Sequence, residues 1–198
     1  MLKVDSARLS GPARERAVEV LKAGGLVAFP TETFYGLGAH ALDASAVRHA
    51  FELKGRPWSK PLLVLVDSMA MAERVALVTA PARALMARHW PGALTLVLPA
   101  QPELPAELTA GTATIGVRLS PHPVARALVA GLAAPITAPS ANPAEAPPPT
   151  TADEVLRYFD GALGLLLDAG PSAGGLPSTI LDMTGDTPRV LRQGAVRL

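Results

Sequence analysis

The pattern of apolar and polar positions predicts a chain in which helices and strands alternate. Apolar residues three and four apart, preceded by capping residues, predict helices over 10–24, 44–54, 68–76, 79–89, 120–128 and 151–159. Short apolar runs bounded by proline, glycine or polar residues predict strands over 26–29, 62–66, 93–99, 114–119, 135–138, 164–168, 178–183 and 189–193. Because strands alternate with helices early and cluster late, we expect an α/β fold with a twisted mixed sheet flanked by helices.

The domain organisation follows from length and composition. The chain has 198 residues, of which 49% are hydrophobic and 18% charged, and this is enough apolar material for one core. The proline-rich segment 143–151 is the most loop-like stretch, and the residues after it are too few to form a separate core. We therefore expect a single domain over 1–198, with 143–151 as a long surface loop and candidate lid.

Composition excludes several classes of site. The sequence has no cysteine, so disulfides, thiolate metal sites and a cysteine nucleophile are ruled out. Its four histidines lack metal-binding spacing, which predicts no tightly bound protein metal site. The N-terminal residues lack an apolar signal region and the apolar runs are too short to cross a bilayer, so we expect a soluble, cytoplasmic protein. At a net charge of +1, any affinity for polyanions must come from a local cluster.

One such cluster is the segment KGRPWSKP at 54–61, which holds two of the chain's four lysines. Lys54, Arg56 and Lys60 have the chemistry of a polyphosphate site, because arginine binds as a fork and lysine as a compact charge. Trp58 is expected either to stack on a base or to cover the site. A solvated basic turn at a helix end is the alternative that this segment alone leaves open.

Three further polar segments adjoin predicted strands. The stretch PTETFYGLG (30–38) suits a small polar substrate, and PSAN (139–142) offers Ser140 and Asn142 to phosphate or carboxylate oxygens. The glycine-rich GGLPST (174–179) has the composition of an anion-binding nest of backbone N–H groups. Each is also compatible with an ordinary turn, and the sequence contains neither a P-loop nor a complete dinucleotide fingerprint.

The order of the motifs is more specific than any one of them. Along the chain stand PTETFYGLG, KGRPWSKPL, WPGALTLVLP, TIGVRLSPHPVARAL, APSAN, GGLPSTILD and LRQGAVR. This series resembles the YrdC-like threonylcarbamoyl-adenylate synthase family over about residues 24–195. The chain resembles the short, single-domain form, since its sequence ends just after the last motif.

The resemblance implies a reaction. Members of that family combine L-threonine, bicarbonate and ATP into threonylcarbamoyl-adenylate and release pyrophosphate. The product serves the threonylcarbamoyl-adenosine modification of tRNA, so the implied partners are the proteins that use the adenylate, with weak tRNA binding as a further expectation. Mg²⁺ is expected to arrive with ATP.

The resemblance also assigns residues. The basic and polar cluster expected to be catalytic is Lys54, Arg56, Ser140 and Asn142. ATP is assigned to Arg56, Lys60, Thr114, Ser140 and Arg192. Threonine is assigned to Thr33, Arg118 and Ser178, with Arg118 facing its carboxylate. From the residues alone, the two strand arginines leave open which face of the sheet they occupy.

Two other functions stay open from the sequence. One is an RNA-binding module, which the balanced overall charge disfavours. The other is a paralogue with the same fold that has a regulatory role or uses another amino acid. The intact set of Lys54, Arg56, Ser140 and Asn142 argues against a degenerate site. Leu65 leaves room for a different amino acid, because longer relatives often have histidine at that position, and Lys60 replaces an asparagine of those relatives. Both departures concern the amino-acid pocket rather than the phosphate site.

Overall fold

The computed structural model describes residues 1–58 and 61–198, and it confirms the predicted α/β character. The helices are α1 (Gly11–Lys22), α2 (Ala44–Lys54), α3 (Met69–Val75), α4 (Ala80–His89), α5 (Ala106–Thr109), α6 (Pro123–Leu132) and α7 (Ala152–Phe159). The strands are β1 (Leu2–Lys3), β2 (Val27–Phe29), β3 (Gly36–Gly38), β4 (Leu63–Leu65), β5 (Leu94–Pro99), β6 (Thr114–Arg118), β7 (Ile136–Thr137), β8 (Leu165–Asp168), β9 (Thr179–Asp182) and β10 (Arg189–Arg192).

The strands form two mixed sheets instead of one. A four-stranded sheet has the order β1-β8-β2-β3, and a six-stranded sheet has the order β10-β9-β5-β6-β4-β7. Both combine parallel and antiparallel pairs. The sheets meet where β3 approaches β7, through isolated bridges that pair Gly36 with Ser140 and His40 with Ile136. This junction brings the polar segments after β2 and after β7 together, which the order of the chain alone does not reveal.

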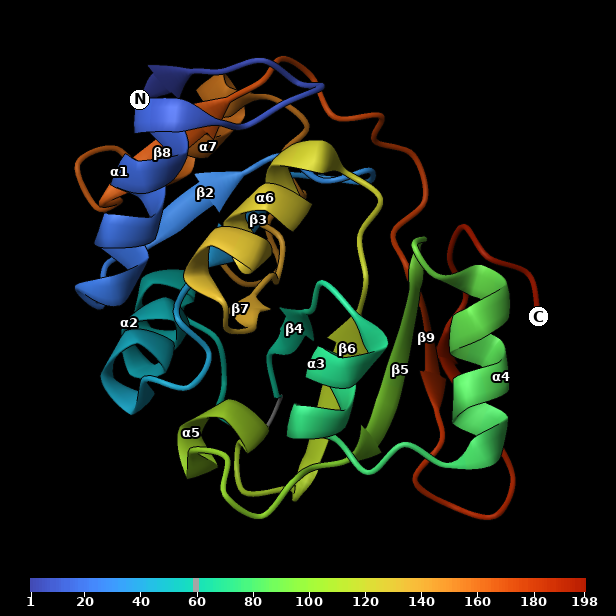
Figure 1. Cartoon of the computed structure of the whole chain (residues 1–198). Helices are drawn as coiled ribbons and strands as arrows, with labels where there is room; N and C mark the ends of the chain where they lie inside the picture. Colours follow the sequence, from blue (N-terminus) through green and yellow to red (C-terminus); the bar gives the residue numbers. More distant parts are fainter. Residues whose placement is uncertain (59–60) are drawn as a thin grey trace.

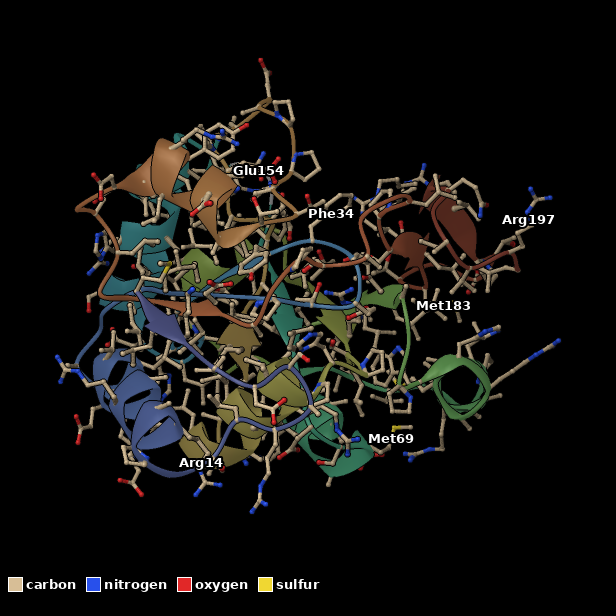
Figure 2. The ribbon with its side chains drawn as sticks, turned by 90° about the horizontal axis from the view of Figure 1, so that it is seen from above. Arg14, Phe34, Met69, Glu154, Met183 and Arg197 are labelled. Atoms are coloured by element: carbon tan, nitrogen blue, oxygen red, sulfur yellow. The ribbon has the colours of Figure 1, made fainter. Side chains whose placement is uncertain are left out.

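The four-stranded sheet is covered on both faces (Figures 1 and 2). Helices α1 and α6 pack together on one face, and α7 lies on the other. The core between these layers is almost wholly aliphatic, with Phe29, Tyr35 and Phe51 as its largest fully buried aromatic side chains. Such continuous apolar burial is typical of an α/β domain whose sheet is enclosed by helices.

Capping residues set most helix boundaries where the sequence places them. The Asp43 carboxylate accepts hydrogen bonds from the backbone N–H groups of Ser45 and Ala46 at 2.8 and 3.2 Å. At the other end of α2, Gly55 has a φ of 57°, a left-handed conformation that glycine adopts without strain. Helix α6 differs from the prediction of 120–128, because His122 rather than Ser120 caps it and because it continues to Leu132.

Strand β3 is the clearest element that the pattern did not predict. Its residues Gly36, Leu37 and Gly38 carry too few apolar side chains to give a strand signal. The structure supplies the reason for the glycines, since the ring of Phe29 on the paired strand lies across them. A Cβ on Gly38 would stand 2.8 Å from Phe29 Cε1, closer than real contacts allow. Packing against an aromatic ring, rather than propensity, therefore makes this segment a strand.

The segment 143–151 is a surface loop, as expected, and hydrogen bonds tie it to the rest of the fold. The backbone N–H of Tyr35 donates to the Pro149 carbonyl at 2.9 Å, and that of Ala144 donates to the Lys54 carbonyl at 2.7 Å. Its role as a lid stays a prediction. Among the helices of 1–58 and 61–198, none has the length and apolar character that crossing a membrane requires.

Candidate active site

A cavity of about 690 Å³ lies over one face of the six-stranded sheet. The loop between β2 and β3 and the segment after β7 form its other walls. In the view from above, Phe34 of the β2–β3 loop lies between the α7 side, marked by Glu154, and Met183 at the end of β9 (Figure 2). Of the residues assigned from sequence, the cavity brings together Thr33, Arg56, Thr114, Arg118, Ser140, Asn142, Ser178 and Arg192.

The two assigned lysines have different outcomes. Lys54 is buried beside the cavity without lining it. Lys60 lies outside the described residues, so its assignment stays a prediction. The eight residues that do line the cavity come from segments spread from the β2–β3 loop to β10, and only the fold makes them neighbours.

The floor of the cavity is set by strand alternation and register. Thr114, Gly116 and Arg118 occupy alternate positions of β6 and therefore share one face. Across that face one row of paired residues runs through Leu63, Gly116, Val97 and Asp182. A second row pairs Thr95 with Ile180 and Ile180 with Arg192. The uncertainty about the faces of Arg118 and Arg192 is thereby resolved, because both line the cavity.

Arg118 is a deeply buried cation of the site. Its side chain is 4% exposed and its Nη1 contacts the Glu32 carboxylate at 2.6 Å, while Ser120 donates its hydroxyl to the other oxygen of Glu32. Burial lowers the pKa of Arg118, and the Glu32 charge opposes that shift. The Nε of Arg118 is buried and has no partner among the described residues. The Arg118–Glu32 pair therefore holds a guanidinium at the cavity, and this guanidinium can still donate hydrogen bonds.

Glu32 is the functional residue that sequence reasoning missed. Glu32 lies between two threonines in PTET, and the sequence interpretation used the hydroxyl side chains of that segment. The available signal was one carboxylate in a stretch of hydroxyl side chains and one arginine in an apolar strand. Their separation of 86 positions hides the pair, because nothing local to either residue indicates a partner.

Arg192 and Ser178 form a second polar group on the floor. Both Nε and Nη2 of Arg192 donate to the Ser178 carbonyl, at 3.1 and 2.8 Å, and Nη2 also contacts the Ser178 hydroxyl. That hydroxyl lies 3.0 Å from the Thr95 hydroxyl. Desolvation, followed by the charge of Arg118, lowers the pKa of Arg192. The positive charges of the two arginines thus repel each other across the floor, and an anion bound between them would reduce this repulsion.

Lys54 makes its described contacts with the backbone and not with the cavity. Its Nζ donates to the carbonyls of Ser140 and Asn142, at 2.6 and 2.5 Å, and the residue is 3% exposed. Burial, and secondarily the charge of Arg56, lowers its pKa to about 8. The ammonium therefore organises the backbone of the PSAN segment, which in turn presents Ser140 and Asn142 to the cavity.

Arg56 reaches the cavity from the turn after α2. One of its Nη groups donates to the Pro61 carbonyl at 3.1 Å, and burial lowers its pKa. Trp58, for which two roles were open, stacks on Phe51 of α2 with ring centroids 4.4 Å apart. Trp58 is 46% exposed and is not among the cavity-lining residues, so its packing covers the helix rather than the site.

Hydroxyl and amide groups complete the walls. The hydroxyls of Thr31 and Thr33 lie 3.1 Å apart, and those of Thr112 and Thr114 lie 2.8 Å apart. Asn142 donates its amide N–H groups to the carbonyls of Pro143 and Ala146, so the turn that was the plain alternative for PSAN does exist. Its Oδ1 is nevertheless buried without a partner in the described part of the chain. Buried acceptors are normally hydrogen-bonded, so this oxygen is a candidate to accept a hydrogen bond from a bound molecule.

The chemistry of this lining favours anionic substrates. Three arginines and several hydroxyl groups face one cavity, and Asp182 is the one carboxylate among the described lining residues. Within the described residues, no group of three or more histidine, aspartate or glutamate side chains could hold a metal ion. The arrangement suits a reaction that brings negatively charged groups together and stabilises charge on them.

Comparison with known proteins places this chain in a family. Residues 19–194 match the model of the Sua5/YciO/YrdC family, which carries the description "Telomere recombination". The threonylcarbamoyl-AMP synthase of Bacillus subtilis (strain 168) is 41% identical over 197 residues, which are 97% of this chain and 56% of that protein.

Two solved structures share the fold at high similarity. The crystal structure of P. abyssi Sua5 complexed with L-threonine has a TM-score of 0.93 at 40% identity, covering 98% of this chain and 58% of that one. The crystal structure of E. coli YciO has a TM-score of 0.89 at 26% identity, covering 98% of this chain and 94% of that one. The chain thus spans little more than half of the synthase and of Sua5, and nearly all of YciO. The expected resemblance is confirmed: the chain belongs to the Sua5/YciO/YrdC family.

Proposed function

We propose that this protein synthesises L-threonylcarbamoyl-adenylate from L-threonine, bicarbonate and ATP, and releases pyrophosphate. The observation that carries the proposal is the cavity itself, where Arg118, Arg56 and Arg192 face one space lined by hydroxyl groups. The similarity to a threonylcarbamoyl-AMP synthase supports it. The wider role, in tRNA modification through proteins that accept the adenylate, in the cytoplasm, rests on the same similarity.

Threonine is assigned to the end of the cavity beside β6. Arg118 faces the carboxylate of the amino acid, since Glu32 holds its buried guanidinium in place and its Nε–H has no partner among the described residues. Thr33 and Ser178 also line the cavity and offer hydroxyl groups to the same ligand. A related Sua5 has been solved with L-threonine, which supports a threonine site in this fold. Charge-assisted, planar recognition of a carboxylate is the strength of arginine.

ATP is assigned to the wall formed by the turn after α2 and the PSAN segment. Arg56, Ser140 and Lys60 would hold the phosphates, Arg192 the α-phosphate region, and Thr114 the nucleoside end. Lys54 acts at one remove, because its ammonium holds the carbonyls of Ser140 and Asn142. Mg²⁺ enters with the nucleotide as part of the substrate.

The chemistry needs no strong base from the protein. The threonine amine forms a bond to the carbon of bicarbonate, and water leaves to give a carbamate. The carboxylate of the carbamate attacks the α-phosphorus of ATP while the bond to pyrophosphate breaks. Catalysis then consists of positioning two anions and stabilising the charge that develops on phosphate. Both the carbamate and the mixed anhydride are labile in water, so a closed site is an advantage, and loop 143–151 is the proposed lid.

The test is a substrate-omission assay. The protein is incubated with ATP, Mg²⁺, bicarbonate and single amino acids, and pyrophosphate and the adenylate are measured by mass spectrometry. We expect both products only when threonine and bicarbonate are present. Product with a different amino acid would assign the site to another substrate, and salt-sensitive tRNA binding without pyrophosphate release would favour the RNA-binding function.

A further inference from the structure

We propose that Asp182 is a specificity-determining residue that accepts a hydrogen bond from a ribose hydroxyl of the nucleotide, so that the site selects ATP over deoxy-ATP. This inference rests on the proposed function, because it places the nucleoside of ATP in the cavity. It concerns the one carboxylate among the described residues that line an otherwise basic site.

The position of Asp182 follows from sheet register. Asp182 ends β9 and pairs with Val97, which in turn pairs with Gly116 and, through it, with Leu63. Ile180, two residues earlier on the same face, belongs to the row that contains Arg192. Asp182 therefore lies one row, about 6.6 Å, along the sheet from the arginine assigned to the α-phosphate.

That spacing fits ribose rather than the base. Ribose is bonded to the α-phosphate through its 5′ oxygen, so it occupies the first row beyond the phosphate. The base must lie further along, toward Thr114 at the end of β6. The row beneath the ribose is apolar and flat, since Gly116 has no side chain and is flanked by Leu63 and Val97. A Cβ at position 116 would lie 3.4 Å from both Leu63 Cβ and Thr95 Cγ2, so the protein has room for it, but it would raise the cavity floor.

The Asp182 carboxylate is ordered and has acceptor capacity left. Its Oδ1 accepts from the backbone N–H and the hydroxyl of Thr184, at 3.0 and 2.7 Å. Its Oδ2 has only a long contact of 3.4 Å with Arg189, whose side chain is 74% exposed. The hydrogen bonds from Thr184 lead the effects that lower the pKa of Asp182, so the group is ionised at neutral pH. An ionised carboxylate is acceptor-only, and a ribose hydroxyl is a donor that it can hold.

The charge pattern of the cavity agrees with this orientation. Arg56 and Arg192 are the arginines assigned to the phosphates, whereas Asp182 lies one row beyond Arg192, where a nucleotide has become neutral. A reversed nucleotide would place its triphosphate beside the carboxylate, which like-charge repulsion disfavours. Asp182 thus contributes direction as well as a hydrogen bond.

The test compares ATP with 2′-deoxy-ATP and 3′-deoxy-ATP in adenylate formation by the unchanged protein. We expect kcat/KM to fall about 10-fold or more for at least one deoxy-nucleotide, which is typical of losing a hydrogen bond to a charged group. In Asp182→Ala and Asp182→Asn, that preference should shrink to less than about 3-fold. Asp186→Asn is the matched control, because Asp186 is an exposed aspartate outside the cavity lining, and it should keep the full preference.

The outcomes separate the two proposals. Failure of the unchanged protein to form adenylate from ATP, threonine and bicarbonate would overturn the proposed function. Adenylate formed equally well from ATP and both deoxy-nucleotides would leave that function standing and overturn the role of Asp182. A preference that survives in Asp182→Ala would also overturn it, and the substrate comparison in the unchanged protein is free of any folding defect.

Discussion

Two cations at the edges of this site are equally buried, but their partners differ. Lys54 and Arg118 are each 3% exposed. Lys54 donates to two backbone carbonyls, which are dipoles without net charge, and its pKa falls to about 8. Arg118 has the carboxylate of Glu32, whose charge opposes the effect of burial. A compensated cation can stay charged and keep a donor for substrate, whereas an uncompensated one serves mainly to hold backbone in place.

Arg118→Ala is the substitution with the largest expected effect, and it tests the role of the compensated cation. We expect KM for threonine to rise about 100-fold, because two charge-assisted hydrogen bonds to the carboxylate are lost. The free energy of unfolding should also fall by ~3–5 kcal/mol, since the half-buried Glu32 carboxylate loses its ion pair and is left with the Ser120 hydroxyl. Steady-state kinetics and chemical denaturation measure the two effects. Unchanged threonine affinity in a folded variant would remove Arg118 from the threonine site.

Lys54→Met should affect the other substrate. Without the ammonium, the carbonyls of Ser140 and Asn142 lose their donor and the segment that presents Ser140 loosens. We expect KM for ATP to rise about 10-fold, the free energy of unfolding to fall by ~2 kcal/mol, and KM for threonine to change little. Lys54→Arg keeps the charge and is the control. If threonine binding weakened instead, the division between the two regions would be wrong.

Glu32→Gln tests whether the negative charge of Glu32 is needed to compensate the charge of Arg118. Glutamine keeps the shape and an acceptor for Arg118 but removes the charge. We expect KM for threonine to rise about 5- to 10-fold, since the orientation of Arg118 becomes less certain, with ATP binding preserved. Glu107→Gln, which disrupts the exposed ion pair with Arg48, is the matched control and should cost ~0.5 kcal/mol or less with no kinetic effect. Equal behaviour of the two variants would refute a positioning role.

The last expected effect is a dependence of stability on pH. The unfolded chain keeps the proton of Lys54 up to its ordinary pKa of 10.5, whereas the folded chain releases it near 8. Between these values the unfolded state binds more protons, so the free energy of unfolding should rise with pH, by at most about 1.4 kcal/mol per pH unit from this group. The difference between the unchanged protein and Lys54→Met across that window isolates the contribution. A difference that is flat with pH would show that the pKa is not depressed.

Local features of this fold could be predicted from the sequence, and pairings between distant segments could not. Caps such as Asp43 and Ser68 act within a few residues, so their helices begin where the sequence places them. The division into two sheets depends on β3, whose glycines give no apolar signal because the Phe29 ring supplies the packing. The packing of that ring over the glycines is a tertiary contact, which local sequence patterns do not reveal.

The same division holds within the site. Motif order identified eight residues that line the cavity, because each motif carries its own polar side chains. The direction in which Lys54 points could not be predicted, since its partners are carbonyls 86 and 88 residues away. Glu32 was missed for the same reason, and so was Asp182, which looks like an ordinary strand-end aspartate until register places it on the cavity floor.

The most direct test of the central claim follows the carbon of bicarbonate. The protein is incubated with ATP, Mg²⁺, threonine and ¹³C-labelled bicarbonate, and the nucleotide products are analysed by mass spectrometry. We predict a threonylcarbamoyl-adenylate that carries the label, formed in equal amount with pyrophosphate and lost in Arg118→Ala. An adenylate without the label, or pyrophosphate released independently of threonine, would contradict the claim that this cavity joins a carbamate to the α-phosphate of ATP.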